Sequence, residues 1–560
     1  MRRIIGAALL SVSIFTTAAW LHAQGREWTT AAFDAQRTGW VRTDARLTRD
    51  AVQKGDFQFL WKAKFENDAR QLHSLTPPIL LDRLIGYRGF KALGFVGGSS
   101  DRVFAIDTDL ARSYWTTHLN YSAATGGRPE SSWECPGGLI ASPTRRTVLA
   151  PQAPAAGGGG GRGGRSGSAV GEPGRGAAIL SQQPPARGRG GAPAGPPPAP
   201  AAGGRAVAPI PFGGVDPVYA VGSDGFLHTL SSANGADMTA PVPFLPPDTK
   251  PSALIFLDGV VYTTTSSECG AAPNAVWAID LTADNKVTSW NTGGADIAGT
   301  TGPTFGGDGT LYVALGQPPR GADSTYANAV VALDRSTLKP KDWFSAPGVE
   351  FNAAPIVFRY KGDQDLVAAT ANDGRMYLLE AASLGGTDHK TPLHVTAKYT
   401  APGARAGLAT WELEGARWIL APVVGAPQPG VKFAATGPAP AGRIVAFKVT
   451  DQGNKAALEP GWASRNLTSP LAPIVVNGLV FAVSSGEYRG TWIPLTAAQR
   501  AQRSTPAVLY VLDGTTGKQL WSSGTTIASF ARGGLSAGAG QVYVVTYDNH
   551  LYAFGIPMEH

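Results

Sequence analysis

A recurring pattern constrains the fold of this chain more than any other feature: an apolar strand, a turn that begins at Asp, and a second strand containing Trp. Clear copies occupy residues 103–119, 276–290, 330–344 and 509–521, and looser copies occupy 225–242, 375–390 and 443–462. Two further short strands precede most copies and meet at turn pairs such as Asp258-Gly259 and Asn477-Gly478, which are typical of two-residue hairpins. Each unit is therefore expected to hold four antiparallel strands over roughly 50 residues.

Repeated four-stranded units of this length predict an all-β fold, a β-propeller whose blades bury their faces against one another. A β-sandwich or several separate domains would leave the recurring Asp-turn-Trp pattern unexplained. We expect the Trp rings to fill space between blades and the Asp side chains to cap turns. The residues concerned are Asp280, Asp334, Asp513, Trp115, Trp290, Trp343 and Trp521.

The two ends of the chain predict how the ring closes. The last residues, 542–554, supply strands of a further unit but no fourth strand, and residues 57–65 form a Trp-bearing strand with no strands before it. Joining both ends in one blade removes two exposed sheet edges. The sequence therefore predicts an eight-bladed propeller closed by its N- and C-terminal strands.

The first residues predict export. Arg2 and Arg3 precede an apolar stretch at 4–21, and Leu-His-Ala precedes Gln24, which together are typical of a secretory signal peptide over 1–23. The alternative is an uncleaved membrane anchor. No Cys follows the apolar stretch, so no lipid anchor is expected, and we expect a periplasmic or secreted protein whose residues 24–560 form the single propeller.

Residues 151–209 are rich in Gly, Pro, Ala and Arg and are predicted to be a disordered, low-complexity insertion within the propeller. They carry six Arg and one Glu, and Arg2 and Arg3 leave with the signal peptide, so these parts account for the whole formal net charge of +7. The remaining body is neutral and offers no broad basic face for nucleic acid.

Two stretches resemble a known family. WTTAAFDAQRTGWV at 28–41, followed by FLWKAKF at 59–65, is similar to the N-terminal segment of quinoprotein alcohol dehydrogenases, and LYVLDGTTGKQLW at 509–521 resembles their repeated tryptophan-docking motif. The resemblance implies a divergent member of the quinoprotein alcohol dehydrogenase-like superfamily, with PQQ-binding-like repeats. That superfamily includes enzymes that bind pyrroloquinoline quinone (PQQ) with Ca²⁺. It also includes non-catalytic propellers, such as the periplasmic scaffold of the outer-membrane β-barrel assembly machine.

The cysteines depart from the family pattern. The alcohol dehydrogenases carry an adjacent Cys-Cys pair beside the quinone, whereas Cys135 and Cys269 are the only cysteines here. No C-x-x-C-H motif is present, so no covalent haem is expected. Both cysteines belong to connections on the same face of neighbouring blades, and export permits a disulfide. We expect a Cys135–Cys269 disulfide; two separate thiols are the alternative.

The same face should collect residues that stand at the starts of first strands. They are His73, Trp133, Glu134, Asp296, Glu350, Asn352, Arg405 and Arg532. If the chain binds a quinone as the resemblance implies, their chemistry suggests Glu134 as a metal ligand and Asp296 as a catalytic base. It likewise suggests Arg405 and Arg532 at the quinone oxygens and Trp133 against the ring. The alternative is that each is a solvated or ion-paired residue of the rim.

Three functions remain open. The leading hypothesis is an exported binding or scaffolding module that takes a protein partner or a small molecule on its axial face. The second is a divergent PQQ- and Ca²⁺-dependent dehydrogenase that oxidises an alcohol or sugar and passes electrons to a separate cytochrome. The third is adhesion to polyanions through the insertion at 151–209, which would be sensitive to salt.

Overall fold

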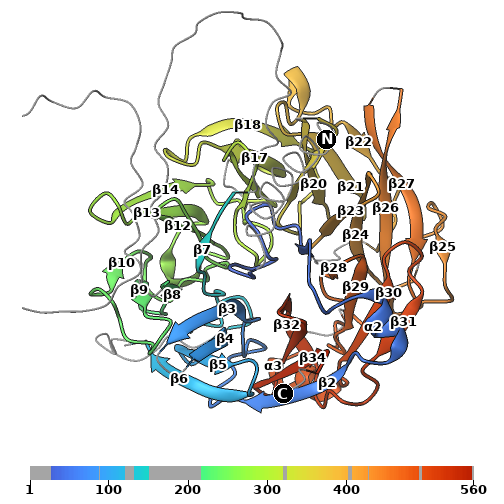
Figure 1. Cartoon of the computed structure of the whole chain (residues 1–560). Coiled ribbons are helices and arrows are strands. Elements are labelled where there is room, and N and C mark those ends of the chain that lie inside the picture. Colours follow the sequence, from blue (N-terminus) through green and yellow to red (C-terminus); the bar gives the residue numbers. More distant parts are fainter. Residues whose placement is uncertain are drawn as a thin grey trace, which may run out of the picture. The chain divides into compact units, whose positions relative to one another are not determined.

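The computed structural model describes residues 27–86, 89–119, 132–149, 216–318, 324–362, 364–401, 407–426, 428–453, 455–490 and 495–557. The predicted signal peptide, the predicted disordered insertion and Arg405 lie outside these residues. The described strands form eight sheets, each mainly antiparallel, which Figure 1 shows side by side around a central axis. The predicted eight-bladed β-propeller is therefore confirmed.

The first four blades follow in order around the axis. Blade 1 holds β32 (Ala531–Gly538), β33 (Gln541–Thr546), β34 (His550–Gly555) and β2 (Gln58–Lys64). Blade 2 holds β3 (Ile79–Gly86), β4 (Gly89–Gly98), β5 (Arg102–Asp107) and β6 (Arg112–His118). Blade 3 holds β8 (Val218–Val221), β9 (Phe226–Leu230) and β10 (Val242–Pro243). Blade 4 holds β11 (Ile255–Leu257), β12 (Val260–Thr265), β13 (Ala275–Asp280) and β14 (Lys286–Asn291), with β7 (Arg146–Thr147) added in parallel.

The remaining blades complete the ring. Blade 5 holds β15 (Thr304–Phe305), β16 (Leu311–Ala314), β17 (Ala329–Leu333) and β18 (Pro340–Ser345). Blade 6 holds β19 (Ile356–Tyr360), β20 (Gln364–Thr370), β21 (Met376–Glu380) and β22 (His394–Val395). Blade 7 holds β23 (Ala409–Leu413), β24 (Ala416–Val424), β26 (Gly442–Gln452), β27 (Lys455–Ala463) and the short β25 (Ala434–Ala435). Blade 8 holds β28 (Ile474–Val476), β29 (Leu479–Ser484), β30 (Val508–Asp513) and β31 (Gln519–Ser522), with β1 (Trp40–Val41) in parallel.

Short helices lie in the connections. They are α2 (Arg49–Lys54), α3 (Ala497–Arg503) and the 3₁₀ turns η1 (Cys269–Ala271) and η2 (Gly386–Asp388). None of the described helices is long and apolar enough to cross a membrane.

Blade 1 closes the ring as the sequence predicts. Strand β2 pairs antiparallel with β34, so that Lys64 lies opposite His550 and Gln58 lies opposite Gly555 (Figure 1). The first strand of this blade is β32, which pairs with β33. Strands from near both ends of the chain therefore share one sheet. Strand β34 of the last hairpin is paired on both sides, with β33 and with β2.

The turn residues behave as their types dictate. Asp258 and Gly259 have φ of 48° and 87°, and Asn477 and Gly478 have φ of 47° and 77°. Positive φ at both central positions defines the hairpin turn that Asx-Gly pairs favour. Asp334 caps its turn by accepting hydrogen bonds from the backbone N–H groups of Ser336 and Thr337.

One looser repeat differs from its expected bounds. The fourth strand of blade 6 is β22, which lies beyond the repeat at 375–390. The intervening residues form η2, and the ring of His389, directly after it, stacks on Trp343 of blade 5 with centroids 3.7 Å apart. This contact between blades uses the residues that the repeat pattern assigns to a strand.

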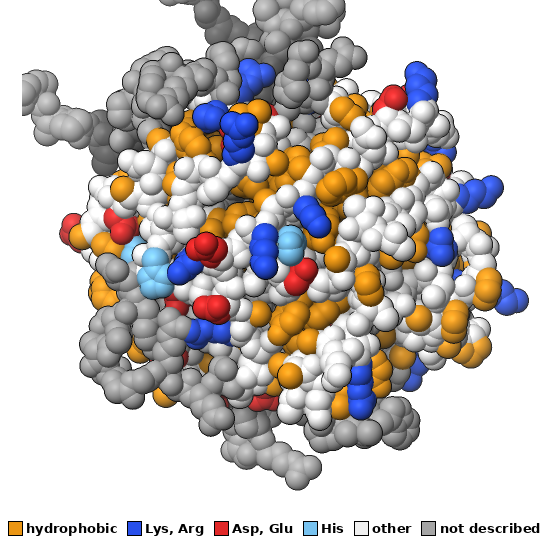
Figure 2. Space-filling model, turned by 90° about the horizontal axis from the view of Figure 1, so that it is seen from below, with side chains coloured by type: hydrophobic (Ala, Val, Ile, Leu, Met, Phe, Trp, Pro, Cys, Tyr) orange, Lys and Arg blue, Asp and Glu red, His pale blue; other side chains and the backbone are white. Residues whose placement is uncertain are grey.

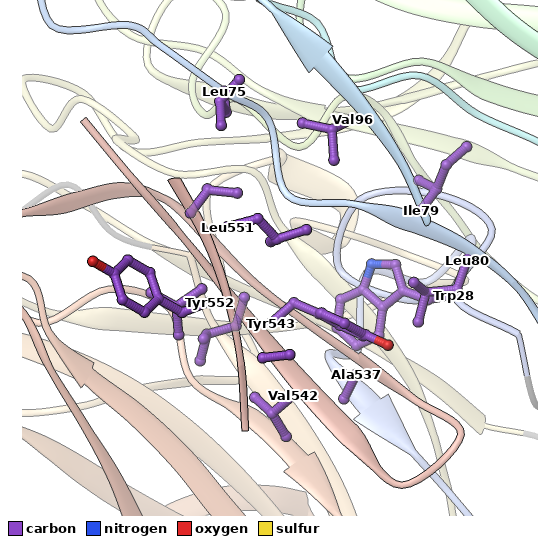
Figure 3. Close-up of a cluster of buried hydrophobic side chains, with 14 of the residues drawn as sticks. Trp28, Leu75, Ile79, Leu80, Val96, Ala537, Val542, Tyr543, Leu551 and Tyr552 are labelled. Carbon is purple, nitrogen blue, oxygen red and sulfur yellow. The ribbon is translucent and has the colours of Figure 1, made fainter. Parts of the chain in front are cut away.

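The largest buried cluster among the described residues runs through blades 8, 1, 2 and 3. Figure 3 shows Leu80 and Val96 of blade 2 facing Val542 and Tyr543 of blade 1, with Trp28 among them. Because blade faces are apolar on both sides, neighbouring blades bury each other's apolar side chains.

Residues 28–41 run around the inside of the ring. In Figure 1 their dark blue trace lies in the middle of the blades. Their backbone or side chains bond in turn to all blades from 2 to 8, at the first strand or at residues just before it. In blade 3 the partner is instead Arg145, which follows Thr144, the residue bridged to Tyr219 of β8. The partners are Leu80, Arg145, Leu254, Phe305, Val357, Thr410 and Val475. This N-terminal segment therefore occupies the axial channel.

Candidate axial-face site

Charged side chains from two connections and from the start of one strand lie together at one end of the propeller axis. Trp133 lies in the connection that precedes blade 3, and Arg500 lies on α3 between β29 and β30 of blade 8. The guanidinium carbon of Arg500 lies 4.3 Å from the centroid of the Trp133 ring, and that of Arg532, at the start of β32, lies 5.0 Å from it. Cation–π attraction of this kind favours both arginines at the ring.

Glu487 lies behind these arginines. Its side chain is 2% exposed and accepts a hydrogen bond from Arg489 Nε at 3.0 Å. Arg500 Nη1 and Arg532 Nε lie 4.0 Å and 3.9 Å from the Glu487 carboxylate. Three guanidinium groups surround one carboxylate, so this set carries a net charge of +2. We call Trp133, Glu487, Arg489, Arg500 and Arg532 the Trp133 cluster.

The local sequence explains how α3 presents Arg500. Thr496 caps the helix by accepting from the backbone N–H of Gln499, and the Gln499 side chain accepts from the backbone N–H of Thr496. This reciprocal capping box fixes the first turn. The backbone N–H of Arg500 donates to Thr496 O at 3.0 Å, so Arg500 stands one turn after the cap.

Charge around the cluster shifts neighbouring pKa values. Burial, together with the positive charges of Arg532 and Lys250, lowers the pKa of His73 to about 3. His73 is therefore neutral at physiological pH. Burial also lowers the pKa of Arg532, although Glu487 partly opposes this shift, while Arg489 and Arg500 add to it. Both shifts follow mainly from burial, and the positive charges nearby add to them.

The predicted disulfide is present between Cys135 and Cys269, whose Cα atoms are 5.4 Å apart. Cys269 begins η1 in the connection between β12 and β13 of blade 4, and Cys135 follows Trp133 by two residues. The backbone N–H of Cys135 also donates to Ser132 Oγ at 3.0 Å. The disulfide therefore ties the Trp133 connection to blade 4.

The other predicted site residues are placed as follows. Trp133 and Arg532 meet in the cluster, as described. The Asp296 carboxylate accepts from the backbone N–H of Ser267 at 2.9 Å, two residues before Cys269, and Lys250 Nζ donates to the Ser267 hydroxyl. Glu134 is exposed, and Arg405 lies outside the described residues.

Three cluster residues were missed by sequence reasoning: Glu487, Arg489 and Arg500. They belong to residues 485–507, the long connection between the second and third strands of blade 8. Its length and its place on the ligand-binding face were the available indications, since loops on that face of a propeller carry the variable contacts. Sequence alone does not show that it reaches Trp133.

The arrangement fits only part of what the family cofactor needs. The arginines suit the carboxylates of a quinone such as PQQ. Calcium needs several oxygen ligands together, and within the described ranges no group of three or more His, Cys, Asp or Glu side chains is arranged to hold a metal ion. We therefore derive no reaction step through a calcium-bound quinone.

Comparison with solved structures agrees on the fold. A quinohemoprotein alcohol dehydrogenase from Comamonas testosteroni superposes with a TM-score of 0.52 at 14% identity, covering 96% of this chain and 81% of that one. A europium-containing methanol dehydrogenase gives a TM-score of 0.50 at 10% identity, with 95% and 98% covered. A quinohemoprotein alcohol dehydrogenase from Pseudomonas putida HK5 gives 0.52 at 11% identity, with 96% and 81% covered.

No protein-family model matches the sequence, and no curated protein shows significant similarity to it. The chain has the eight-bladed propeller fold of the quinoprotein alcohol dehydrogenases at very low sequence identity. At such identity the likeness defines the fold, and function has to be argued from the site.

Proposed function

We propose that this protein is an exported binding module whose Trp133 cluster takes up a small ligand bearing two or more carboxylate groups. The observation that carries the proposal is the excess of three guanidinium groups over the single buried carboxylate of Glu487. Guanidinium groups bind carboxylates through paired hydrogen bonds, which are strong where water is partly excluded.

The aromatic ring and the disulfide support this proposal by pre-organising the cluster. Trp133 is 37% exposed, so its ring holds Arg500 and Arg532 near the surface, where a ligand from solution can reach them. Holding donors in place before binding reduces the entropy lost on association. The neutral charge of the rest of the body makes a general attraction to polyanions a weaker explanation, and Figure 2 shows acidic, basic and hydrophobic side chains interspersed on the face it presents.

Isothermal titration calorimetry of the mature protein tests the proposal. The probes are citrate, PQQ with and without Ca²⁺, and glucose as a neutral control. We expect citrate or PQQ to bind without Ca²⁺, and to bind more weakly as salt is raised because the attraction is electrostatic. Arg500→Gln and Arg532→Gln should each weaken binding at least tenfold. Arg503→Gln on the same helix, where Arg503 lies over Tyr488 rather than Trp133, should not.

The same titration separates the alternatives. PQQ binding that requires Ca²⁺ would favour the dehydrogenase hypothesis, and alcohols and sugars would then be assayed with an external electron acceptor. Binding of neither citrate nor PQQ would overturn the proposed function and leave a protein partner as the remaining hypothesis for the axial face.

A further inference from the structure

The N-terminal segment contains an arginine, Arg37, whose hydrogen bonds close part of the segment into a loop. Arg37 is 1% exposed. Its Nη1 donates to Thr30 Oγ1 at 2.8 Å and to Ala31 O at 2.7 Å, seven and six residues earlier in the chain, respectively. Its Nε donates to Pro303 O at 3.1 Å, just before β15 of blade 5. The guanidinium therefore connects Arg37 to the start of the segment and to blade 5, inside the ring of blades.

None of these three contacts balances the charge of Arg37, and its electrostatic partner is the carboxylate of Asp34. All three acceptors are neutral oxygens. Asp34, the nearest acidic residue along the chain, directs its carboxylate to the backbone N–H and hydroxyl of Thr38 at 2.9 Å and 2.7 Å, and to Arg42 at 3.6 Å. Burial lowers the pKa of Arg37 to about 9, and the negative charge of Asp34 partly opposes this shift, so the group is still protonated at neutral pH. A buried cation that shares its one carboxylate partner with Arg42 is costly.

Unpartnered polar atoms stand at the same place in the chain. Arg37 Nη2 is buried, and no residue in the described part of the chain accepts a hydrogen bond from it. Both side-chain amide atoms of Gln36, a residue only 5% exposed, are buried and unpartnered as well. Buried donors are normally satisfied by protein groups, by ordered water or by a bound ion. Gly302 lies beside Nη2, since a Cβ there would come within 3.0 Å of it.

We propose that the axial channel holds a small inorganic anion, of halide size, bound to Arg37 Nη2 beside Gln36. The anion supplies the hydrogen-bond acceptor that Nη2 lacks and adds to the negative charge of Asp34, and it fastens the N-terminal segment inside the ring. This site is separate from the Trp133 cluster: none of the residues that carry it contacts that cluster. It does not depend on the proposed carboxylate ligand.

Crystals of the mature protein grown with chloride and soaked in sodium bromide test the site directly. We expect an anomalous bromide peak within hydrogen-bonding distance of Arg37 Nη2. Density at that place that behaves as water, with no bromide after soaking, would overturn the proposal.

A solution measurement uses matched variants on the same segment. The thermal midpoint is followed in potassium bromide against potassium gluconate at constant ionic strength. For the unmodified protein we expect a rise of about 1–2 °C for each tenfold increase in bromide. Arg37→Met should remove the bromide dependence, whereas Arg42→Gln, whose side chain is 43% exposed, should keep it. If Arg37→Met does not fold, Gln36→Leu is measured in its place and should weaken the dependence. Equal midpoints in both salts for the unmodified protein would contradict the proposal.

Discussion

Trp462 of blade 7 donates its indole Nε1–H to the carbonyl oxygen of Gly514 in blade 8, at 2.8 Å. The same contact recurs around the ring: Trp61 of blade 1 donates to Thr108 O of blade 2 at 3.1 Å, and Trp115 of blade 2 donates to Ser232 O of blade 3 at 2.9 Å. In each case the indole reaches the turn that joins the last two strands of the neighbouring blade: β30 and β31, β5 and β6, and β9 and β10, respectively. The Trp positions in the sequence therefore mark contacts between blades.

The Trp462 contact leaves no room for a side chain at Gly517. A Cβ at this position would lie 2.3 Å from Trp462 Cε3, and the residue has φ of +69°. We expect Gly517→Ala to lower the free energy of unfolding by about 1–3 kcal/mol more than Gly524→Ala. Gly524 also has positive φ, of +55°, but a Cβ added there would have no atom within 4 Å. The comparison therefore isolates the effect of the steric clash with Trp462. Urea unfolding followed by Trp fluorescence measures both. Equal losses would show that the indole moves away at little cost.

Most of the fold was predictable because its evidence repeats along the chain. The missing fourth strand at the C-terminus and the unpaired strand around Trp61 predict the closing blade, and β2 pairs with β34 as expected. The Cys135–Cys269 disulfide followed from the same topology. The Trp133 cluster was only partly predictable, because Arg500 lies in a connection outside the repeat. The course of this connection over the axial face is set by tertiary packing, which cannot be predicted from a local sequence pattern.

Removing the disulfide should weaken the axial site more than it weakens the fold. The bond joins Cys135, beside Trp133, to Cys269 in blade 4, while the blades themselves are held by sheets and buried faces. We expect the Cys135→Ser, Cys269→Ser double variant to bind citrate at least fivefold more weakly, since Trp133 is then free to leave Arg500 and Arg532. Calorimetry measures affinity, and near-ultraviolet circular dichroism checks that the propeller is retained. Unchanged affinity would show that the connection is held without the bond.

Asp82 should make stability fall as pH rises. Burial, with the negative charge of Glu27, raises its pKa to about 7 in the folded protein, above the unfolded value of 3.8. The stabilisation from protonated Asp82 is therefore fully present below pH 3.8 and is lost as pH rises through about 7. At pH 8 we expect the free energy of unfolding of Asp82→Asn to exceed that of the unmodified protein by about 1–3 kcal/mol. At pH 4 we expect little difference between the two. Asp50→Asn, at an exposed position on α2, is the control. Urea titrations across this pH range measure the difference in free energy of unfolding between the variant and the unmodified protein. The same difference at both pH values would contradict a raised pKa of Asp82.

Glu487 should oppose the proposed binding of a carboxylate ligand, although it stabilises the cluster. Its buried carboxylate is bonded to Arg489 and lies near Arg500 and Arg532, so Glu487→Gln raises the local charge from +2 to +3. We expect the variant to bind citrate several-fold more tightly, and more so at low salt, because one more positive charge is unscreened. We also expect its free energy of unfolding to fall by about 2–4 kcal/mol, since the arginines lose a buried partner. Citrate should restore part of the lost thermal midpoint, because the ligand replaces the missing negative charge. Calorimetry at two salt concentrations and a thermal scan with citrate measure these effects. Weaker citrate binding by Glu487→Gln would mean that Glu487 orders the arginines for the ligand and that its charge is secondary.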